Sequence, residues 1–182
     1  MGSSIITGRG DSGETDLLYG KRIAKSSVRV GVLGCIDELN AALGLARVVS
    51  TDAEVTGIID GLQEKLVGLM GELACVPEDA ERYAEQFKCA LTMEDVVKVQ
   101  ETARAAEQRG IRFTGWARPG AEGSMMKAGL DFARTIARRT EREVWLLHES
   151  GEPVSEPIRL FFNRVSDLLW ILARVSGEPA GS

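Results

Sequence analysis

Apolar residues recur every three or four positions in five stretches of this chain, a spacing typical of helices that pack in a bundle. The first stretch covers residues 28–50. The second covers 52–76, with Asp52 as its N-cap and Pro77 directly after it as the residue that ends the helix. The polar residues 78–89 that follow are predicted to form a connection.

Three more helices are predicted in the second half of the chain. A capping box that begins at Thr92, in the sequence TMED, opens a helix over 92–109. A long helix follows over 124–150, and Ser155 caps a last one that reaches about residue 176. The five helices together predict an all-α fold, whereas the first 27 residues have no helical period.

The composition favours one helical domain and excludes several classes of protein. The chain has 182 residues, of which 44% are hydrophobic and only 5% aromatic, so it can bury a core and favours helices over sheets. The net charge of -5 argues against nucleic acid as a partner. No stretch approaches the roughly 20 apolar residues of a membrane span, and the start MGSSII lacks the pattern of a signal peptide. We therefore expect a cytoplasmic protein that binds neither nucleic acid nor a membrane.

Cysteine and histidine are too few for several kinds of catalytic centre. Cys35, Cys75 and Cys89 have no CxxC spacing, which fits a reducing compartment. His148 is the single histidine, and this excludes His-rich metal centres, an ordinary Ser/His/Asp triad and the paired Glu-x-x-His motifs of di-iron bundles.

Residues 7–15, TGRGDSGET, are the first candidate for binding chemistry. Their three glycines alternate with hydroxyl-bearing and charged residues, and a backbone rich in N–H donors can wrap a phosphate chain. Arg9 and Lys25 add positive charge. The Walker pattern is absent, however, and the alternative is that this glycine-rich segment is a disordered tail.

A column of arginines on the helix predicted over 124–150 is the second candidate. Arg134, Arg138 and Arg142 stand four residues apart, and Glu141 and Trp145 share their face. The opposite side is predicted to be an apolar stripe made of Ala133, Ile136, Ala137, Thr140, Val144 and Leu147. Stacked arginines repel one another unless anions lie between them, so the column favours carboxylate or phosphate partners. The alternative is a solvated charged face in which Glu141 compensates part of the charge.

Polar residues on two other helices bear on this column. Asp37 and Glu38 on the first helix are acidic groups that can answer the arginines, as is Asp167 on the last helix. Asn163, Asp167, Trp170 and Arg174 share one face of the last helix, opposite its apolar stripe, and we predict that this face is a hydrated surface.

Four motifs together resemble the PduO-type ATP:corrinoid adenosyltransferases. In chain order they are TGRGDSGET, CIDELNAALGLAR, ARTIARRTERE and FFNRVSDLLWILAR. The resemblance spans nearly the whole chain and implies a five-helix up-and-down bundle of the ferritin-like kind, assembled as a trimer with active sites between subunits. It also implies an ATP-binding loop over 1–27, the adenosyltransferase domain over 28–176 and a C-terminal tail over 177–182.

The same resemblance implies an ATP site that the N-terminal loop and the arginine helix of one subunit build together. The implied ATP-binding residues are Thr7, Gly8, Arg9, Gly10, Asp11, Gly13, Thr15, Asp16, Lys25, Arg138, Arg139, Glu141, Arg142 and Asn163. Arg134, Arg138 and Asp37 are implied in catalysis, with Asp37 paired to Arg134 across the subunit interface. By their spacing, Arg138 and Arg142 point at phosphates.

The implied reaction transfers the 5′-deoxyadenosyl group of ATP to the cobalt of reduced cob(I)alamin or a related corrinoid, giving adenosylcobalamin and triphosphate. It needs no acid, base or nucleophile from the protein, and Mg²⁺ is held mainly through the ATP phosphates. The implied partners are two further copies of the chain, a flavin-dependent reductase and a B12-dependent acceptor enzyme. The alternatives are an adenosylcobalamin carrier with little catalysis, which hands its cargo to a mutase, and a non-catalytic helical module.

The wall that faces the lower side of the corrinoid is implied to lie in the loop before the 124–150 helix. The phenylalanine that the family places before a P-G-G turn aligns with Trp116, which keeps the spacing to Pro119, and Phe113 is the rival position. The chain departs from the family pattern here, because Arg118 stands where an apolar residue is common and Ala121 replaces the second glycine.

Overall fold

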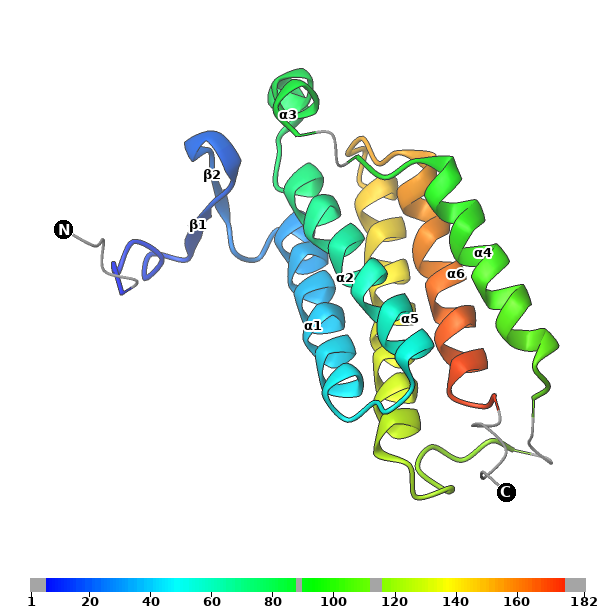
Figure 1. Cartoon of the computed structure of the whole chain (residues 1–182). Coiled ribbons are helices and arrows are strands. Elements are labelled where there is room, and N and C mark those ends of the chain that lie inside the picture. The colour runs from blue at the N-terminus through cyan, green and yellow to red at the C-terminus, as the bar shows by residue number, and fades with distance from the viewer. Residues whose placement is uncertain (1–5, 88–89, 112–115, 176–182) are drawn as a thin grey trace.

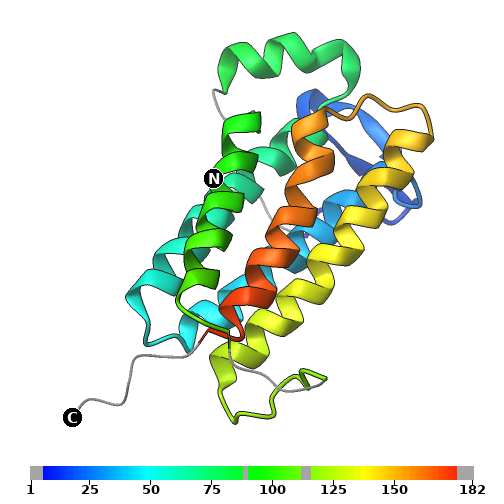
Figure 2. The same ribbon diagram turned by 90° about the vertical axis from the view of Figure 1, so that its right-hand side faces the viewer.

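Five long helices run alternately up and down to form the bundle seen in the computed structural model, which describes residues 6–87, 90–111 and 116–175 (Figure 1). They are α1 (Val28–Val48), α2 (Ala53–Leu73), α4 (Met93–Gln108), α5 (Met125–Glu149) and α6 (Glu156–Leu172). α5 packs against both α1 and α6, α2 packs against α1, and α6 lies between α4 and α5 (Figure 2). The predicted all-α bundle is confirmed.

Polar side chains begin most of these helices at the predicted places. Asp52 accepts hydrogen bonds from two backbone N–H groups at the start of α2, and Ser124 accepts one at the start of α5. Thr92 and Asp95 form the complete reciprocal capping box of α4. Ser155 precedes α6 but makes no side-chain cap bond. Capping therefore fixes where three of the four predicted starts fall.

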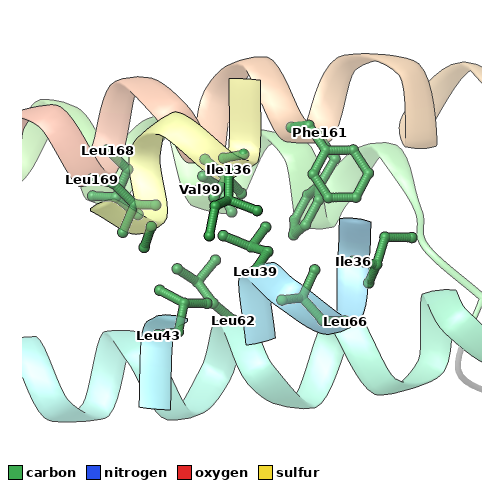
Figure 3. Close-up of a cluster of buried hydrophobic side chains, with 14 of the residues drawn as sticks. Ile36, Leu39, Leu43, Leu62, Leu66, Val99, Ile136, Phe161, Leu168 and Leu169 are labelled. Atoms are coloured by element: carbon green, nitrogen blue, oxygen red, sulfur yellow. The ribbon is translucent and has the colours of Figure 1, made fainter. Parts of the chain in front are cut away.

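The core lies along the bundle axis and receives side chains from every long helix (Figure 3). The apolar stripe predicted for the last helix is buried, with Phe161 and Leu168 almost fully enclosed. Each large side chain buried in this way stabilises the fold by roughly 1.5–3 kcal/mol. The core makes α5 and α6 a rigid support for the polar residues on their outer sides.

Several boundaries differ from the sequence prediction. The segment 78–89 is more than a connection, because it contains a 3-10 turn, η2 (Pro77–Asp79), and a short helix, α3 (Ala80–Gln86). Tyr83 is the one apolar anchor of α3 and is buried, and a single anchor gives no period to detect. Helix α6 also ends at Leu172 rather than near residue 176.

The N-terminal segment forms a two-stranded hairpin that projects from the α1 side of the bundle (Figure 1). Strand β1 (Glu14–Asp16) pairs antiparallel with β2 (Arg22–Ala24), and the 3-10 turn η1 (Leu18–Gly20) lies between them. The alternative of a disordered tail therefore fails for this part of the chain. Strands of three residues are too short to produce a readable alternation of polar and apolar positions.

Within the described residues, no helix combines the length and the apolar character that crossing a membrane requires.

Candidate functional site

The outer side of α5 carries the arginine column, as the periodicity predicted. Arg134, Arg138, Arg142 and Trp145 all lie at least partly exposed on this side. The stripe predicted to be apolar is buried and consists of Ala133, Ile136, Ala137, Thr140, Val144 and Leu147. Burial of this stripe fixes the rotation of α5 and therefore the direction in which the arginines project.

Arg134, at the first turn of the column, has a carboxylate partner within its own chain. Its Nε donates to Asp131 Oδ1 at 3.2 Å. Asp131 is only 5% exposed and also receives both terminal nitrogens of Arg174, with the shortest contacts at 3.0 Å. Two arginines thus share one buried carboxylate, an arrangement that offsets part of the cost of removing these charges from water.

Arg174 corrects one prediction about the last helix. It was expected on a hydrated face, but it is 5% exposed and follows the end of α6. Its guanidinium carbon lies 4.6 Å from the centroid of the Trp170 ring, and it donates to the Trp170 carbonyl. Asp167, from the same predicted face, is exposed. Sequence reasoning missed Asp131 and its role, although a carboxylate placed among the apolar positions of α5 was a visible signal.

Arg138 differs from its neighbours because its guanidinium has no hydrogen-bond or ion-pair partner in the described part of the chain. Glu38 on α1, which was expected to answer the column, instead forms an ion pair with Arg139, the residue after Arg138 in the sequence. Arg142 Nη1 donates to the Arg138 carbonyl at 3.0 Å. Within the described residues the column therefore presents two guanidinium groups without a carboxylate partner, those of Arg138 and Arg142, and the Arg138 group makes no hydrogen bond at all. Both are available to an anion from outside the chain.

Asn163 and Glu141 are brought together beside the column. Asn163 Nδ2 donates to Glu141 Oε1 at 3.2 Å, and Arg164 Nη1 donates to Asn163 Oδ1 at 2.6 Å. Glu141 also lines a shallow hollow of about 570 Å³ that includes Arg138 and Arg142. The predicted residues of α5 and α6 thus form one connected polar surface.

The glycine-rich segment is ordered by two consecutive turns. Asp11 N donates to the Gly8 carbonyl at 3.1 Å, and Gly13 N donates to the Gly10 carbonyl at 3.3 Å. Gly8 and Gly13 have positive φ, which side chains disfavour. A Cβ on Gly10 would lie only 2.9 Å from the Lys25 ammonium. The glycines therefore permit a tight loop that lies against a cation.

Charged side chains tie this loop to the hairpin. Asp16 accepts hydrogen bonds from Arg9 at 3.2 Å and from Arg22 at 3.1 Å. Arg22 also donates to the Arg9 carbonyl at 3.1 Å, a role that sequence reasoning missed. Thr7 Oγ1 accepts from Arg9 N at 3.4 Å, whereas Thr15 lies in β1 opposite Ile23.

A single chain does not join the two sets of candidate residues. Within the described part of the chain, no hydrogen bond or ion pair links residues 7–25 to α5 or α6. Asp37 is exposed on α1, and Arg134 pairs with Asp131 instead of with Asp37 in the same chain. The predicted pair between Asp37 and Arg134 of another subunit stays a prediction.

The loop before α5 contains the candidate for the corrinoid wall. Trp116 is 92% exposed, and Phe113 lies outside the described residues. Trp116 and Arg118 line a small hollow of about 180 Å³, at which Asp131 and Arg174 also lie. The exposed Trp116 therefore lies next to the buried ion pair of Asp131 and Arg174.

Within the described residues, no group of three or more His, Cys, Asp or Glu side chains is arranged to hold a metal ion. The site offers cations, backbone N–H groups and polar side chains, which suit an anionic ligand such as a phosphate chain.

Comparisons with known proteins agree with this chemistry. The family model described as cobalamin adenosyltransferase matches residues 5–176. The corrinoid adenosyltransferase of Mycobacterium leprae is 31% identical over 174 residues, covering 94% of this chain and 90% of that protein. The corrinoid adenosyltransferase PduO of Salmonella typhimurium is 31% identical over 180 residues, covering 97% of this chain, which spans only 51% of that longer relative.

Solved structures agree as well. A variant of the PduO-type ATP:corrinoid adenosyltransferase from Lactobacillus reuteri, complexed with cobalamin and ATP, superposes with a TM-score of 0.81 at 26% identity and covers 94% of this chain and 92% of that one. The family model covers nearly the whole sequence, and the relatives and the fold point the same way. The chain belongs to the cobalamin adenosyltransferase family.

Proposed function

We propose that this protein transfers the 5′-deoxyadenosyl group of ATP to the cobalt of a reduced corrinoid, releasing triphosphate. Membership of the family supports this function. The observation that carries it is the free guanidinium of Arg138, which lies in the column between Arg134, already bound to a carboxylate, and Arg142, which has no carboxylate partner in the described residues. An anionic leaving group is the ligand that such a face lacks.

The reaction requires no acid, base or nucleophile from the protein. Cobalt(I) supplies the electron pair that forms the bond to the 5′-carbon, and the carbon–oxygen bond that breaks leaves its electron pair on the triphosphate. Arg138 and Arg142 stabilise the charge that gathers on this leaving group, and the fixed surface of α5 holds the two reactants in line. Glu141 and Asn163 orient the nucleotide beside them.

The N-terminal loop completes the ATP site in this proposal. The backbone N–H groups of residues 7–13 and the Lys25 ammonium lie along the phosphate chain. Mg²⁺ is held mainly by the phosphates. Trp116, which is open to solvent, forms the wall against the lower face of the corrinoid.

The site is shared between chains of a trimer. Support comes from the hairpin, which projects away from its own bundle (Figure 1) and makes no bond to its own α5 or α6 within the described residues. Exposed apolar side chains on α1 and α5, including Leu45, Val48 and Phe132, offer a surface for a second copy. The N-terminal loop of one chain then meets the arginine column of its neighbour, in place of the one-subunit arrangement that the sequence suggested.

A reductase that supplies the electron and an enzyme that accepts adenosylcobalamin are the further partners of this proposal. The chemistry requires the first, because cobalt must be in its lowest oxidation state before it attacks carbon. The second follows from the product, which is itself a cofactor.

The test is an anaerobic incubation with MgATP and chemically reduced cob(I)alamin. We expect loss of the cobalt(I) absorbance and formation of adenosylcobalamin, confirmed by chromatography, only when both ATP and protein are present. Binding of adenosylcobalamin without any product would favour the carrier function instead. Absence of both binding and product would exclude both functions.

A further inference from the structure

The short helix α3, which lies between α2 and α4 in the chain, contacts the turn of the N-terminal hairpin. Tyr19 Oη donates to Gln86 Oε1 at 2.7 Å, and the Arg82 guanidinium carbon lies 3.9 Å from the centroid of the Tyr19 ring. Next to it, Leu18 N donates to the Ala74 carbonyl at 3.0 Å. The hairpin is thus held at its turn by α3 and by the end of α2.

The backbone at this turn does not favour a tyrosine. Tyr19 has φ 58° and ψ 24°, the only positive φ of a non-glycine residue in the described part of the chain, and Gly20 follows with φ 74°. Turns with two successive positive φ values prefer Asn, Asp and Gly. A bulky side chain in this conformation persists only where its surroundings hold it. The contacts with Gln86 and Arg82 are the ones that do so here.

Helix α3 is itself fixed, so it can act as a support. The buried Tyr83 donates its hydroxyl to the Gly68 carbonyl at 3.0 Å. A Cβ on Gly71 would collide with that hydroxyl, so the missing side chain at Gly71 lets Tyr83 seat against α2. The Tyr83 ring also stacks on Phe87 with the centroids 5.0 Å apart. The position of Arg82 and Gln86 is therefore set by the bundle.

The hairpin connects this fixed turn to the candidate ATP loop, so the orientation of the hairpin sets where the loop lies. Asp16 and Arg22 face each other in the ladder next to the turn, and Arg22 reaches the Arg9 carbonyl at 3.1 Å. At the far end, Lys25 N donates to the Gly13 carbonyl at 2.8 Å. Within the described residues, the hydrogen bonds that join this hairpin to the bundle are both made at its turn, from Leu18 N and from Tyr19 Oη.

We propose that Tyr19 is a positioning residue which, through Gln86 and Arg82, sets the orientation of the hairpin and thereby the affinity for ATP. The inference rests on the proposed function, because that function assigns the ATP phosphates to the loop that the hairpin carries. Tyr19 itself makes no contact with the nucleotide in this proposal. The segment between α2 and α4 accordingly has a functional role that its lack of periodicity concealed.

The experiment measures MgATP binding to the full chain by calorimetry, together with the KM for ATP and kcat with chemically reduced cob(I)alamin. Tyr19→Asn keeps the turn conformation and removes both contacts. Arg82→Ala removes only the contact with the ring. We expect each to weaken ATP binding by about threefold to tenfold, the factor that one hydrogen bond or cation–π contact contributes, with kcat at saturating ATP unchanged.

Conservative variants and a matched control separate positioning from general damage. Tyr19→Phe keeps the ring under Arg82 and should fall between the original chain and Tyr19→Asn, and Arg82→Lys should restore part of the affinity that Arg82→Ala loses. Glu85→Ala changes an exposed residue of the same helix and should bind MgATP as the original chain does. The midpoint of thermal unfolding should stay constant throughout, because these contacts lie outside the core.

Two results would overturn the inference while leaving the proposed function intact. One is unchanged ATP affinity in both Tyr19→Asn and Arg82→Ala, when the original chain binds MgATP. The other is a loss of kcat and of thermal stability in parallel with affinity, which would make the contact merely structural. If the original chain itself binds no MgATP, the proposed function is wrong, and this inference, which rests on it, is wrong as well.

Discussion

Arg134 and Arg138 stand one helical turn apart on α5, yet their surroundings differ completely. Arg134 donates to Asp131, a buried carboxylate that also holds Arg174. Arg138 has no such partner within the described residues. The same residue type in the same column thus serves the fold at one turn and remains open for a ligand at the next.

A charge on a functional face therefore indicates a ligand only once its partners within the chain are known. Arg134 belongs to a closed ion-pair network beneath the loop of Trp116. Removing one member of such a network leaves a buried charge uncompensated, whereas removing Arg138 leaves nothing behind that is unsatisfied. The two sites should therefore respond in opposite ways to substitution, one in stability and the other in activity.

The largest effect should come from Asp131→Ala. This change leaves Arg174 buried without its carboxylate and should lower the free energy of unfolding by about 3–5 kcal/mol. Urea unfolding monitored by circular dichroism measures it. Asp167→Ala, at an exposed aspartate of α6, is the control and should change stability little. Equal stability of the two variants would show that the buried network does not support the fold.

Arg138→Ala should have the next largest effect, and on activity alone. Loss of a phosphate contact in the leaving group should reduce turnover with cob(I)alamin at least tenfold, equivalent to ~1.4 kcal/mol of transition-state stabilisation. The urea midpoint should not move, since the guanidinium has no partner within the described chain. Unchanged turnover would contradict the assignment of Arg138 to the triphosphate.

This contrast marks how far the sequence alone could predict the molecule. The period of α5 correctly gave the buried stripe and the direction of the arginines, because a single geometric rule governs a long helix. It could not tell Arg134 from Arg138, because Arg174 reaches Asp131 from a position 43 residues later in the chain. Partners so distant in sequence are decided by packing and leave no local pattern.

The hairpin and α3 illustrate the same limit. Three-residue strands and a helix with one buried anchor offer too few positions for a period. The contact between Tyr19 and Gln86, 67 residues apart, is likewise invisible in the sequence. The motif TGRGDSGET nevertheless identified the candidate ATP loop, because glycine-rich composition reflects a local need for tight turns.

On the proposed corrinoid side, the exposed side chain of Trp116 lies beside the buried ion pair of Asp131 and Arg174. Trp116→Ala should impair the reaction that starts from cobalt(II) and a reductase more than the reaction with prereduced cobalt(I), by about threefold to tenfold, the contribution of one aromatic contact. Parallel assays with the two cobalt states measure the ratio. Equal losses would indicate general damage to the loop instead of a wall at the lower face.

The smallest effect concerns Glu72, a half-buried carboxyl that, unlike Asp131, has no cationic partner among the described residues. Burial raises the pKa of Glu72, and one hydrogen bond from Leu91 N opposes this only in part. A raised pKa in the folded state means that the contribution of Glu72 to stability is present at low pH and is lost as the pH rises through the folded pKa.

Glu72→Gln keeps the acceptor for Leu91 N and removes the titration. The variant should therefore match the original chain near pH 4 and become more stable than it near pH 8, as measured by urea unfolding at both values. Asp60→Asn is the control of opposite sign, because the hydrogen bond from Arg47 lowers the pKa of Asp60 and its contribution is lost as the pH falls. If Glu72→Gln and the original chain had the same stability at every pH, burial of the Glu72 carboxylate without a cation would not lower the stability of the fold. The difference between charges with and without a partner, seen at Arg134 and Arg138, would then not extend beyond α5.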